Sequence, residues 1–256
     1  TSHPDLYYFD YLEMQQHVFQ QNWHAVDSLY NRLTNHFRLQ NNKIILSRLY
    51  SMYGTALNAK GEYKQSTSYL LSLIEEIASI KDENKFIPLH QESLCAMYYE
   101  LALGSMSLHK LDDANTYIDS CTKILQQTAD TALLTEAYNL AGVLCNRMGI
   151  PEKAIKKYKQ AYELNSHTTN TQLGRLILQN IAALYSDMFR FDKALEFSRK
   201  IYSIFPVEKQ LNLRHRIEYI HTLNTTAVIQ LNCKMPQNAL DTLGLALKLI
   251  QPEIPQ

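Results

Sequence analysis

Apolar residues recur at helical spacing along almost the whole chain. Around Ile177, for example, apolar side chains return at Ile181 and Leu184, which places them on one face of a helix. Stretches of this kind predict about twelve helices joined by short connections. We expect them near residues 5–20, 23–39, 43–60, 63–82, 87–109, 112–127, 131–148, 151–166, 170–188, 191–204, 208–233 and 236–251.

Several of these helices begin with residues that are typical of helix starts. Pro151 and Pro236 stand where a first turn is expected, and proline suits that turn because its missing N–H would be unpaired there anyway. Asp112 and Asp192 are expected just before their helices, where a carboxylate caps backbone N–H groups. The connections contain no linker rich in proline, glycine or serine. We therefore expect one continuous domain over residues 1–256.

A helix-hairpin repeat underlies the pattern. Two copies share an aromatic residue, a glycine four positions later and a second glycine after seven more: Tyr50, Gly54 and Gly61, and Tyr138, Gly142 and Gly149. The first glycine lets two helices cross closely, and the second ends the first helix in a left-handed conformation. A small or β-branched residue of the second helix then packs on the first. This marker recurs, at spacings of 40, 48, 40, 40 and 45, at Val26, Ser66, Ala114, Ala154, Ala194 and Ala239.

The unit resembles the tetratricopeptide repeat, a helix-turn-helix element of about 34 residues. The resemblance implies an all-α fold, a right-handed α-solenoid of about six hairpins and about twelve helices. The hairpins would cover approximately residues 5–40, 43–82, 87–127, 131–166, 170–206 and 208–251. The period is nearer 40 residues than 34, which resembles the long repeats of bacterial sensor and scaffold domains.

Composition supports an all-helical protein and disfavours several functions. The chain has 7 glycines and 7 prolines, few for its 256 residues, whereas sheets and tight hairpins need both. Its 25 Lys+Arg and 25 Asp+Glu give a formal net charge of zero, so we expect neither direct nucleic-acid binding nor a polybasic membrane surface. No apolar stretch approaches the ~18 residues of a membrane span. Since the chain starts at Thr1, we expect a mature product or an excised segment.

The residues that carry catalysis in known motifs are missing. The sequence contains no phosphate-binding glycine loop, no dinucleotide fingerprint, no helical zinc motif and no nucleophile elbow. We therefore expect no enzyme activity, no cofactor and no metal. The four cysteines have no paired spacing and are expected to be small, buried apolar residues: Cys95, Cys121, Cys145 and Cys233. Most of the 17 tyrosines fall at packing positions, such as Tyr50, Tyr98, Tyr138, Tyr158 and Tyr185.

A ligand surface is expected on the first helix of each hairpin, which lines the concave face of such solenoids. The position after the packing residue of the first helix should face this groove, and it holds Ser51, Tyr99, Asn139, Gln179 and Asn224. Further groove candidates are Asn58, Asn146, Arg147, Asn180 and Asn232. Amide side chains carry both donors and acceptors, so this amide stripe suits an extended peptide backbone. The alternative is that Asn and Gln are merely tolerated on exposed helix faces.

Chaperone adaptors of the family clamp a carboxylate with cations and amides on successive first helices. The matching places here hold Ser51, Thr55, Glu100, Glu136 and Leu140, and the two glutamates would repel a carboxylate. The resemblance instead favours a protein- or peptide-binding sensor or scaffold segment of a bacterial signalling or transcription regulator. Its style of repeat favours the periplasmic side of a membrane-tethered protein. The alternatives are a cytoplasmic peptide-pheromone receptor of quorum-sensing type and a structural scaffold that forms homodimers through a terminal repeat.

Overall fold

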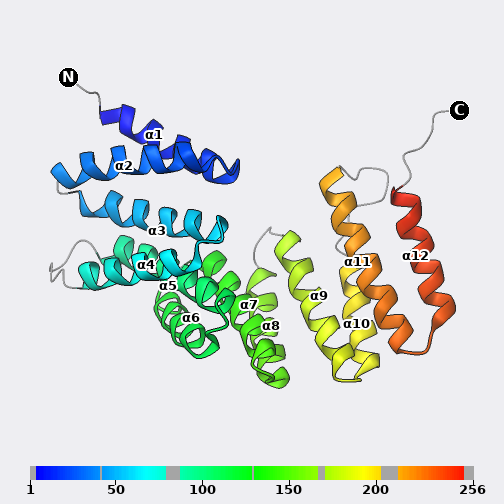
Figure 1. The fold of residues 1–256 in the computed structure, drawn as a ribbon. Helices are drawn as coiled ribbons and strands as arrows, with labels where there is room; N and C mark the ends of the chain where they lie inside the picture. The colour runs from blue at the N-terminus through cyan, green and yellow to red at the C-terminus, as the bar shows by residue number, and fades with distance from the viewer. Residues whose placement is uncertain are drawn as a thin grey trace, which may run out of the picture. The chain divides into compact units, whose positions relative to one another are not determined.

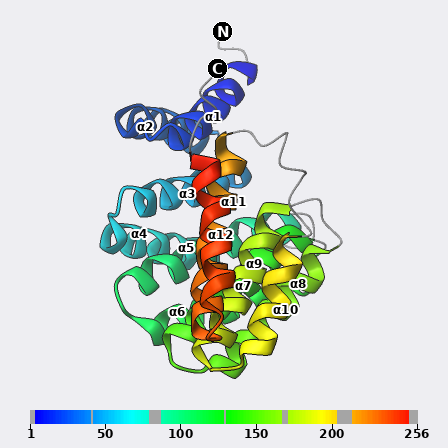
Figure 2. The same cartoon turned by 90° about the vertical axis from the view of Figure 1, so that its right-hand side faces the viewer.

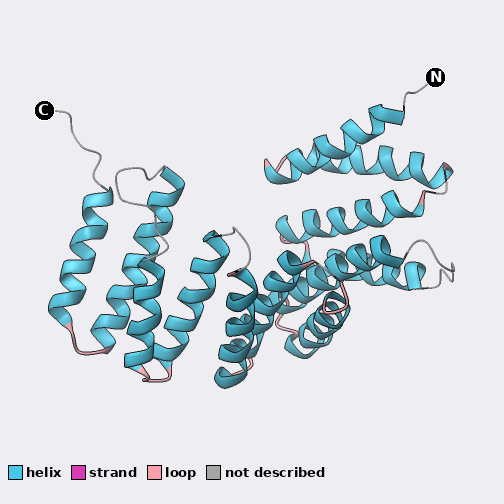
Figure 3. Cartoon of the chain, turned by 180° about the vertical axis from the view of Figure 1, so that it is seen from behind, coloured by secondary structure: helices cyan, strands magenta, loops and turns pink. Residues whose placement is uncertain are grey.

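The chain forms helical hairpins and, where the structure describes it, contains no strand (Figure 3). The computed structural model describes residues 4–40, 42–78, 87–128, 130–166, 171–202 and 213–250. It divides into two compact units, unit 1 at Thr1–Asp130 and unit 2 at Thr131–Gln256. The single continuous domain expected from the sequence stays a prediction.

Each unit contains three hairpins (Figure 1). Unit 1 consists of α1 (Pro4–Phe19), α2 (Trp23–Leu39), α3 (Lys43–Ala59), α4 (Tyr63–Ala78), α5 (Ile87–Ser107) and α6 (Leu111–Leu125). Unit 2 consists of α7 (Thr131–Arg147), α8 (Pro151–Asn165), α9 (Thr171–Asp187), α10 (Phe191–Tyr202), α11 (Leu213–Asn232) and α12 (Pro236–Ile250). The odd-numbered helices are called first helices below, and the even-numbered ones second helices. Within each unit, neighbouring first helices pack on one another and each second helix packs on its own first helix.

The predicted helices are confirmed, and their ends mostly agree within three residues. Pro151 and Pro236 open α8 and α12 as expected. The prediction for Asp112 and Asp192 was wrong, because α6 begins at Leu111 and α10 at Phe191. Both carboxylates therefore lie in the first turn, where they interact with the positive end of the helix dipole rather than capping it. The predicted stretches 79–82, 203–206 and 208–212 lie outside the described residues.

Every hairpin turns at a residue with positive φ, which we call the stop residue. Gly61 (φ 82°) and Gly149 (φ 75°) are the two that the sequence predicts. Four other residues adopt the same conformation with φ of 58° or 59°, namely Gln21, His109, Phe189 and Lys234. After each stop residue a backbone N–H bonds the carbonyl five residues earlier, for example Ile150 N to Cys145 O at 2.9 Å. The six stop residues have the spacings of the sequence repeat, so they give every first helix a common register.

The two helices of a hairpin cross closely at the glycines. A Cβ added at Gly142 would lie 2.5 Å from the Tyr158 ring, and one at Gly54 would lie 2.6 Å from Leu70. Ser66 also touches the first helix, because its hydroxyl donates to the Gly54 carbonyl at 3.2 Å. The role assigned to these residues from the sequence is confirmed.

Each unit has an apolar core along the hairpin interfaces. In unit 1 the core runs from Met14 and Leu33 to Leu101, and in unit 2 it includes Ile177 and Ile201. Of the five tyrosines predicted to pack, Tyr98 is half-buried. The other four are buried, namely Tyr50, Tyr138, Tyr158 and Tyr185. The cysteines are free thiols; three are buried, and Cys233 is half-buried just beyond the end of α11. These cores pack the helices of each unit against one another.

Candidate functional site

Polar side chains join successive first helices, and in unit 1 they lie between α3 and α5. Ser47 donates to Ser93 at 3.1 Å. Glu100 is nearly buried, and its carboxylate accepts from Thr55 at 2.8 Å and from Asn58 at 2.7 Å. The Asn58 amide also donates to the Glu100 backbone carbonyl at 2.9 Å. A carboxylate satisfied in this way belongs to the helix interface and is not poised to meet a ligand.

Unit 2 repeats this arrangement with different residues. From α9 to α11, the Gln179 amide donates to Thr222 at 2.6 Å and the Arg175 guanidinium bonds Glu218 at 2.6 Å. At the other end of the same interface Asn232 donates to Ser186 at 2.9 Å. Between α7 and α9, the side-chain amide nitrogen of Asn180 donates to the side-chain amide oxygen (Oδ1) of Asn139 at 3.2 Å.

The bonded residues share one register. On the earlier helix of each bonded pair, most partners lie 14, 10 or 3 positions before the stop residue of that helix. Ser47 and Arg175 lie 14 positions before it, Asn139 and Gln179 lie 10 before it, and Asn58 and Ser186 lie 3 before it. Their partners on the later helix lie 16, 12, 9 or 2 positions before their own stop residue: Ser93, Glu218, Thr222, Asn180, Glu100 and Asn232. Each first helix thus has a row facing the next first helix, called here the forward row, and a row facing the previous one, called the backward row.

The predicted amide stripe is part of the forward row. Its members stand ten positions before the stop residue, and their exposure differs from one first helix to another. Ser51 is buried, Tyr99, Asn139 and Gln179 are half-buried, and Asn224 on α11 is exposed. The structure brings Asn139 and Asn180 together, and it places Asn146 and Arg147 on the exposed end of α7. Several predicted groove amides are therefore bonded at the helix interface, which sequence periodicity could not reveal.

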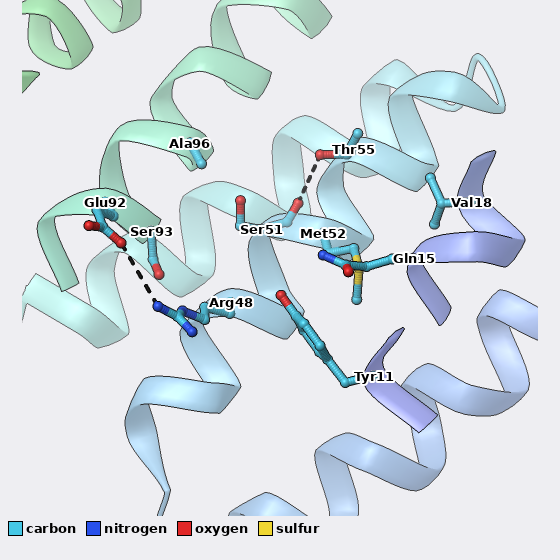
Figure 4. A pocket seen from close by; sticks show the side chains of 10 residues that line it. All are labelled: Tyr11, Gln15, Val18, Arg48, Ser51, Met52, Thr55, Glu92, Ser93 and Ala96. Carbon is cyan, nitrogen blue, oxygen red and sulfur yellow. Dashed lines mark hydrogen bonds and ion pairs between the residues drawn. The ribbon is translucent and has the colours of Figure 1, made fainter. Parts of the chain in front are cut away.

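A pocket of 380 Å³ opens between the first helices of unit 1 (Figure 4). Its ten lining residues come from α1, α3 and α5, namely Tyr11, Gln15, Val18, Arg48, Ser51, Met52, Thr55, Glu92, Ser93 and Ala96. Figure 4 shows these side chains around one space, with Val18 of α1 and Met52 of α3 on one side and the pair Arg48 and Glu92 on the other. Ser51 is the predicted site residue that reaches it.

The charged pair of the pocket is Arg48 and Glu92, whose side-chain atoms lie 3.9 Å apart and are both about half exposed. An exposed pair at this distance contributes little to stability, so either partner can exchange its contact for a ligand at low cost. Neither this pair nor the α1 residues were among the site residues predicted from the sequence. Applying the register of the stripe to the first hairpin would have found Tyr11, which stands ten positions before Gln21.

The described residues contain no group of three or more His, Cys, Asp or Glu arranged to hold a metal ion. Among those same residues, no helix is both long enough and apolar enough to cross a membrane. The pocket lining offers hydroxyl, amide, guanidinium and carboxylate groups, which can donate and accept hydrogen bonds.

The sequence matches no family model and no curated protein. Solved structures of several solenoid proteins match the fold. BtubC (BKLC) from P. vanneervenii is similar at a TM-score of 0.71 and 14% identity, with 95% of both chains covered. The apo form of the quorum sensor NprR from B. thuringiensis has a TM-score of 0.69 and 15% identity, over 96% of this chain and 66% of NprR.

A signal transduction ATPase with a tetratricopeptide repeat sensor, from Pyrococcus horikoshii, has a TM-score of 0.73 and 16% identity. The match covers 95% of this chain and 35% of the ATPase. At these identities the matches show the fold alone. The all-α fold and the resemblance to tetratricopeptide-like solenoids, both predicted from the sequence, are confirmed.

Proposed function

We propose that this tetratricopeptide-like solenoid holds an extended segment of another protein against its first helices. The observation that carries the proposal is the pocket that α1, α3 and α5 form together. Three successive first helices contribute to it, so its shape depends on the stacking of the repeats. A solenoid presents such an extended surface as its usual binding face.

The pocket has the size and composition expected for one anchoring side chain of a peptide. A volume of 380 Å³ lies at the lower end of the range for ligand sites. Val18, Met52 and Ala96 give it an apolar part, and Gln15 and the serine hydroxyls give it a polar edge. The expected ligand segment therefore carries one medium-sized apolar residue, with its backbone bonded by the polar edge.

The amide stripe remains a proposed second contact, in unit 2. Asn180 donates to Asn139, which leaves the Asn139 amide nitrogen and the Asn180 carbonyl oxygen without a further bond within the described part of the chain. One donor and one acceptor side by side match the C=O and N–H of a peptide backbone. The proposed flanking contacts are Asn146 and Arg147 on α7, Gln179 on α9 and Asn224 on α11.

In its biological role the module is proposed to be a sensor or scaffold segment of a bacterial regulator. The fold likeness to the quorum sensor NprR and to the sensor-bearing ATPase supports this proposal. The runner-up is a receptor for short linear peptides of quorum-sensing type, favoured by the match over two thirds of NprR. Short free peptides and segments within folded proteins are the two ligands to compare.

The binding test uses a displayed library of unstructured peptides, selected on the wild-type chain and measured by fluorescence anisotropy. Gln15→Trp places an indole at the pocket mouth, and Gln65→Trp is the matched control because Gln65 is exposed on the second helix α4. We expect Gln15→Trp to weaken binding at least about tenfold and Gln65→Trp to leave it unchanged. Equal affinities of the two variants would contradict the pocket proposal. Binding of isolated peptides favours the receptor role, and binding only within a folded partner favours the scaffold role.

A further inference from the structure

The first helix of unit 1 exposes apolar residues on its backward row. Phe9 stands twelve positions before its stop residue and is 65% exposed. The equivalent residues of the later first helices are at most 1% exposed, namely Leu49, Met97, Ala137, Ile177 and Thr222. Leu12, three positions further along α1, is 42% exposed. We call Phe9 and Leu12 the head face.

The last hairpin exposes apolar residues on the opposite side of the repeat. On α12, Leu240 is 63% exposed, whereas its equivalent Ile155 on α8 is 7% exposed and packs in the core with α9. Leu247 is 60% exposed, and its equivalent Ile74 on α4 is 8% exposed. These positions of a second helix pack on the next first helix.

The forward row of α11 continues this surface. Val228 and Leu231 stand six and three positions before the stop residue Lys234, and they are 57% and 52% exposed. The equivalent of Leu231 on α9 is Ser186, which is 4% exposed and bonded to α11. We call Val228, Leu231, Leu240 and Leu247 the tail face. In Figure 2 α12 faces the viewer, with α11 behind it and no other described helix of unit 2 in front of it.

We propose that the tail face of one copy of this chain packs against the head face of a second copy. The tail-face positions are those that, in an inner hairpin, pack on the next first helix. The head-face positions are those that, in an inner first helix, pack on the previous hairpin. The contact therefore repeats between copies the stacking that holds the hairpins together within each unit. A symmetric contact of two tail faces would instead pair two forward rows, a combination that occurs nowhere within the units.

The apolar character of both faces also supports a second copy of the chain as the partner that covers them. The head face and the tail face hold large apolar side chains at positions that are buried in inner hairpins, so covering them removes apolar surface from water. Contacts between two different faces propagate from copy to copy into a chain, unless the geometry closes them into a ring.

Sedimentation velocity on the purified chain over a wide concentration range tests the proposal. The head variant carries Phe9→Glu and Leu12→Glu, and the tail variant carries Leu240→Glu and Leu247→Glu. Leu39→Glu is the control, because Leu39 is 90% exposed and belongs to neither face. We expect the wild type and the control to associate further as concentration rises. Each double variant alone should stay monomeric, while their equimolar mixture should form a 1:1 dimer and nothing larger.

The mixture decides between modes of contact, because each double variant retains one intact face. A monomeric wild type at every concentration would overturn the proposal and would leave a further repeat of a longer chain as the occupant. The proposal would also be overturned if the head variant alone dimerised while the tail variant alone stayed monomeric. That result would mean that two tail faces pack on each other. Circular dichroism checks that the exposed substitutions keep the fold. If a double variant unfolds, the single variants Phe9→Lys and Leu247→Lys replace it. They are expected to give the same pattern of association with a smaller loss of self-association.

Discussion

Replacing Gly142 by alanine should cost stability, whereas the same change at Gly244 should not. A Cβ at Gly142 would lie 2.5 Å from two carbons of the buried Tyr158 ring, and that ring cannot move without displacing its neighbours. Overpacking of this kind costs about 1–3 kcal/mol. Alanine in place of glycine within a helix gains about 0.5–1 kcal/mol, and at Gly244 no atom lies within 4 Å to oppose this gain.

Both glycines are inside helices of unit 2, so the gain from replacing glycine by alanine within a helix is common to the two variants and cancels when they are compared. The free energy of unfolding should therefore be lower for Gly142→Ala than for Gly244→Ala by about 1–3 kcal/mol. In urea unfolding followed by circular dichroism, this difference separates the two midpoints by roughly 0.5–2 M. Midpoints that shift equally in both variants would refute the close helix crossing.

Three further outcomes are expected from the polar and aromatic contacts. Glu218→Ala removes the carboxylate bonded to the buried Arg175 guanidinium, so urea unfolding should show a loss of about 1.5–3 kcal/mol; no loss would contradict the bond. Burial raises the pKa of Tyr158 to about 12, and the unfolded tyrosine ionises near its ordinary value of about 10. Because the unfolded state then holds fewer protons, the free energy of unfolding should fall between about pH 10 and 12. Tyr158→Phe should make that fall smaller but leave the parts contributed by Tyr53 and Tyr69, whose pKa values burial also raises. Replacing Asn139 and Asn180 together by alanine should cost about 0.5–1.5 kcal/mol through their lost bond, and an unchanged melting temperature would show that the bond is absent in solution.

The fold was predictable because its determinants are local. Apolar periodicity marks each helix, and the glycines at 61 and 149 mark two of the turns by their conformational freedom. The stop residues Gln21, His109, Phe189 and Lys234 were not predictable individually. Glutamine, phenylalanine and lysine rarely adopt positive φ, and histidine does so only somewhat more often.

The candidate site was predictable only in part, because it depends on contacts between residues about 40 positions apart. The sequence identified the register of Ser51 and Asn139, but it could not tell that Asn139 bonds Asn180 across two helices. Arg48 and Glu92 form a pair across the pocket although nothing in their own helices distinguishes them. Likewise, the exposure of Phe9 follows from the lack of a described hairpin before it and not from its residue type.

The most direct test of ligand binding by the first helices is site-specific photocrosslinking. A benzophenone amino acid is placed at Gln15, on the pocket mouth, or at Gln65, on the second helix α4, and each protein is irradiated with the same selected peptide. Crosslinks at position 15 and none at position 65 are predicted. Crosslinks at position 65 with none at position 15 would place the ligand on the second helices and contradict binding in the first-helix pocket.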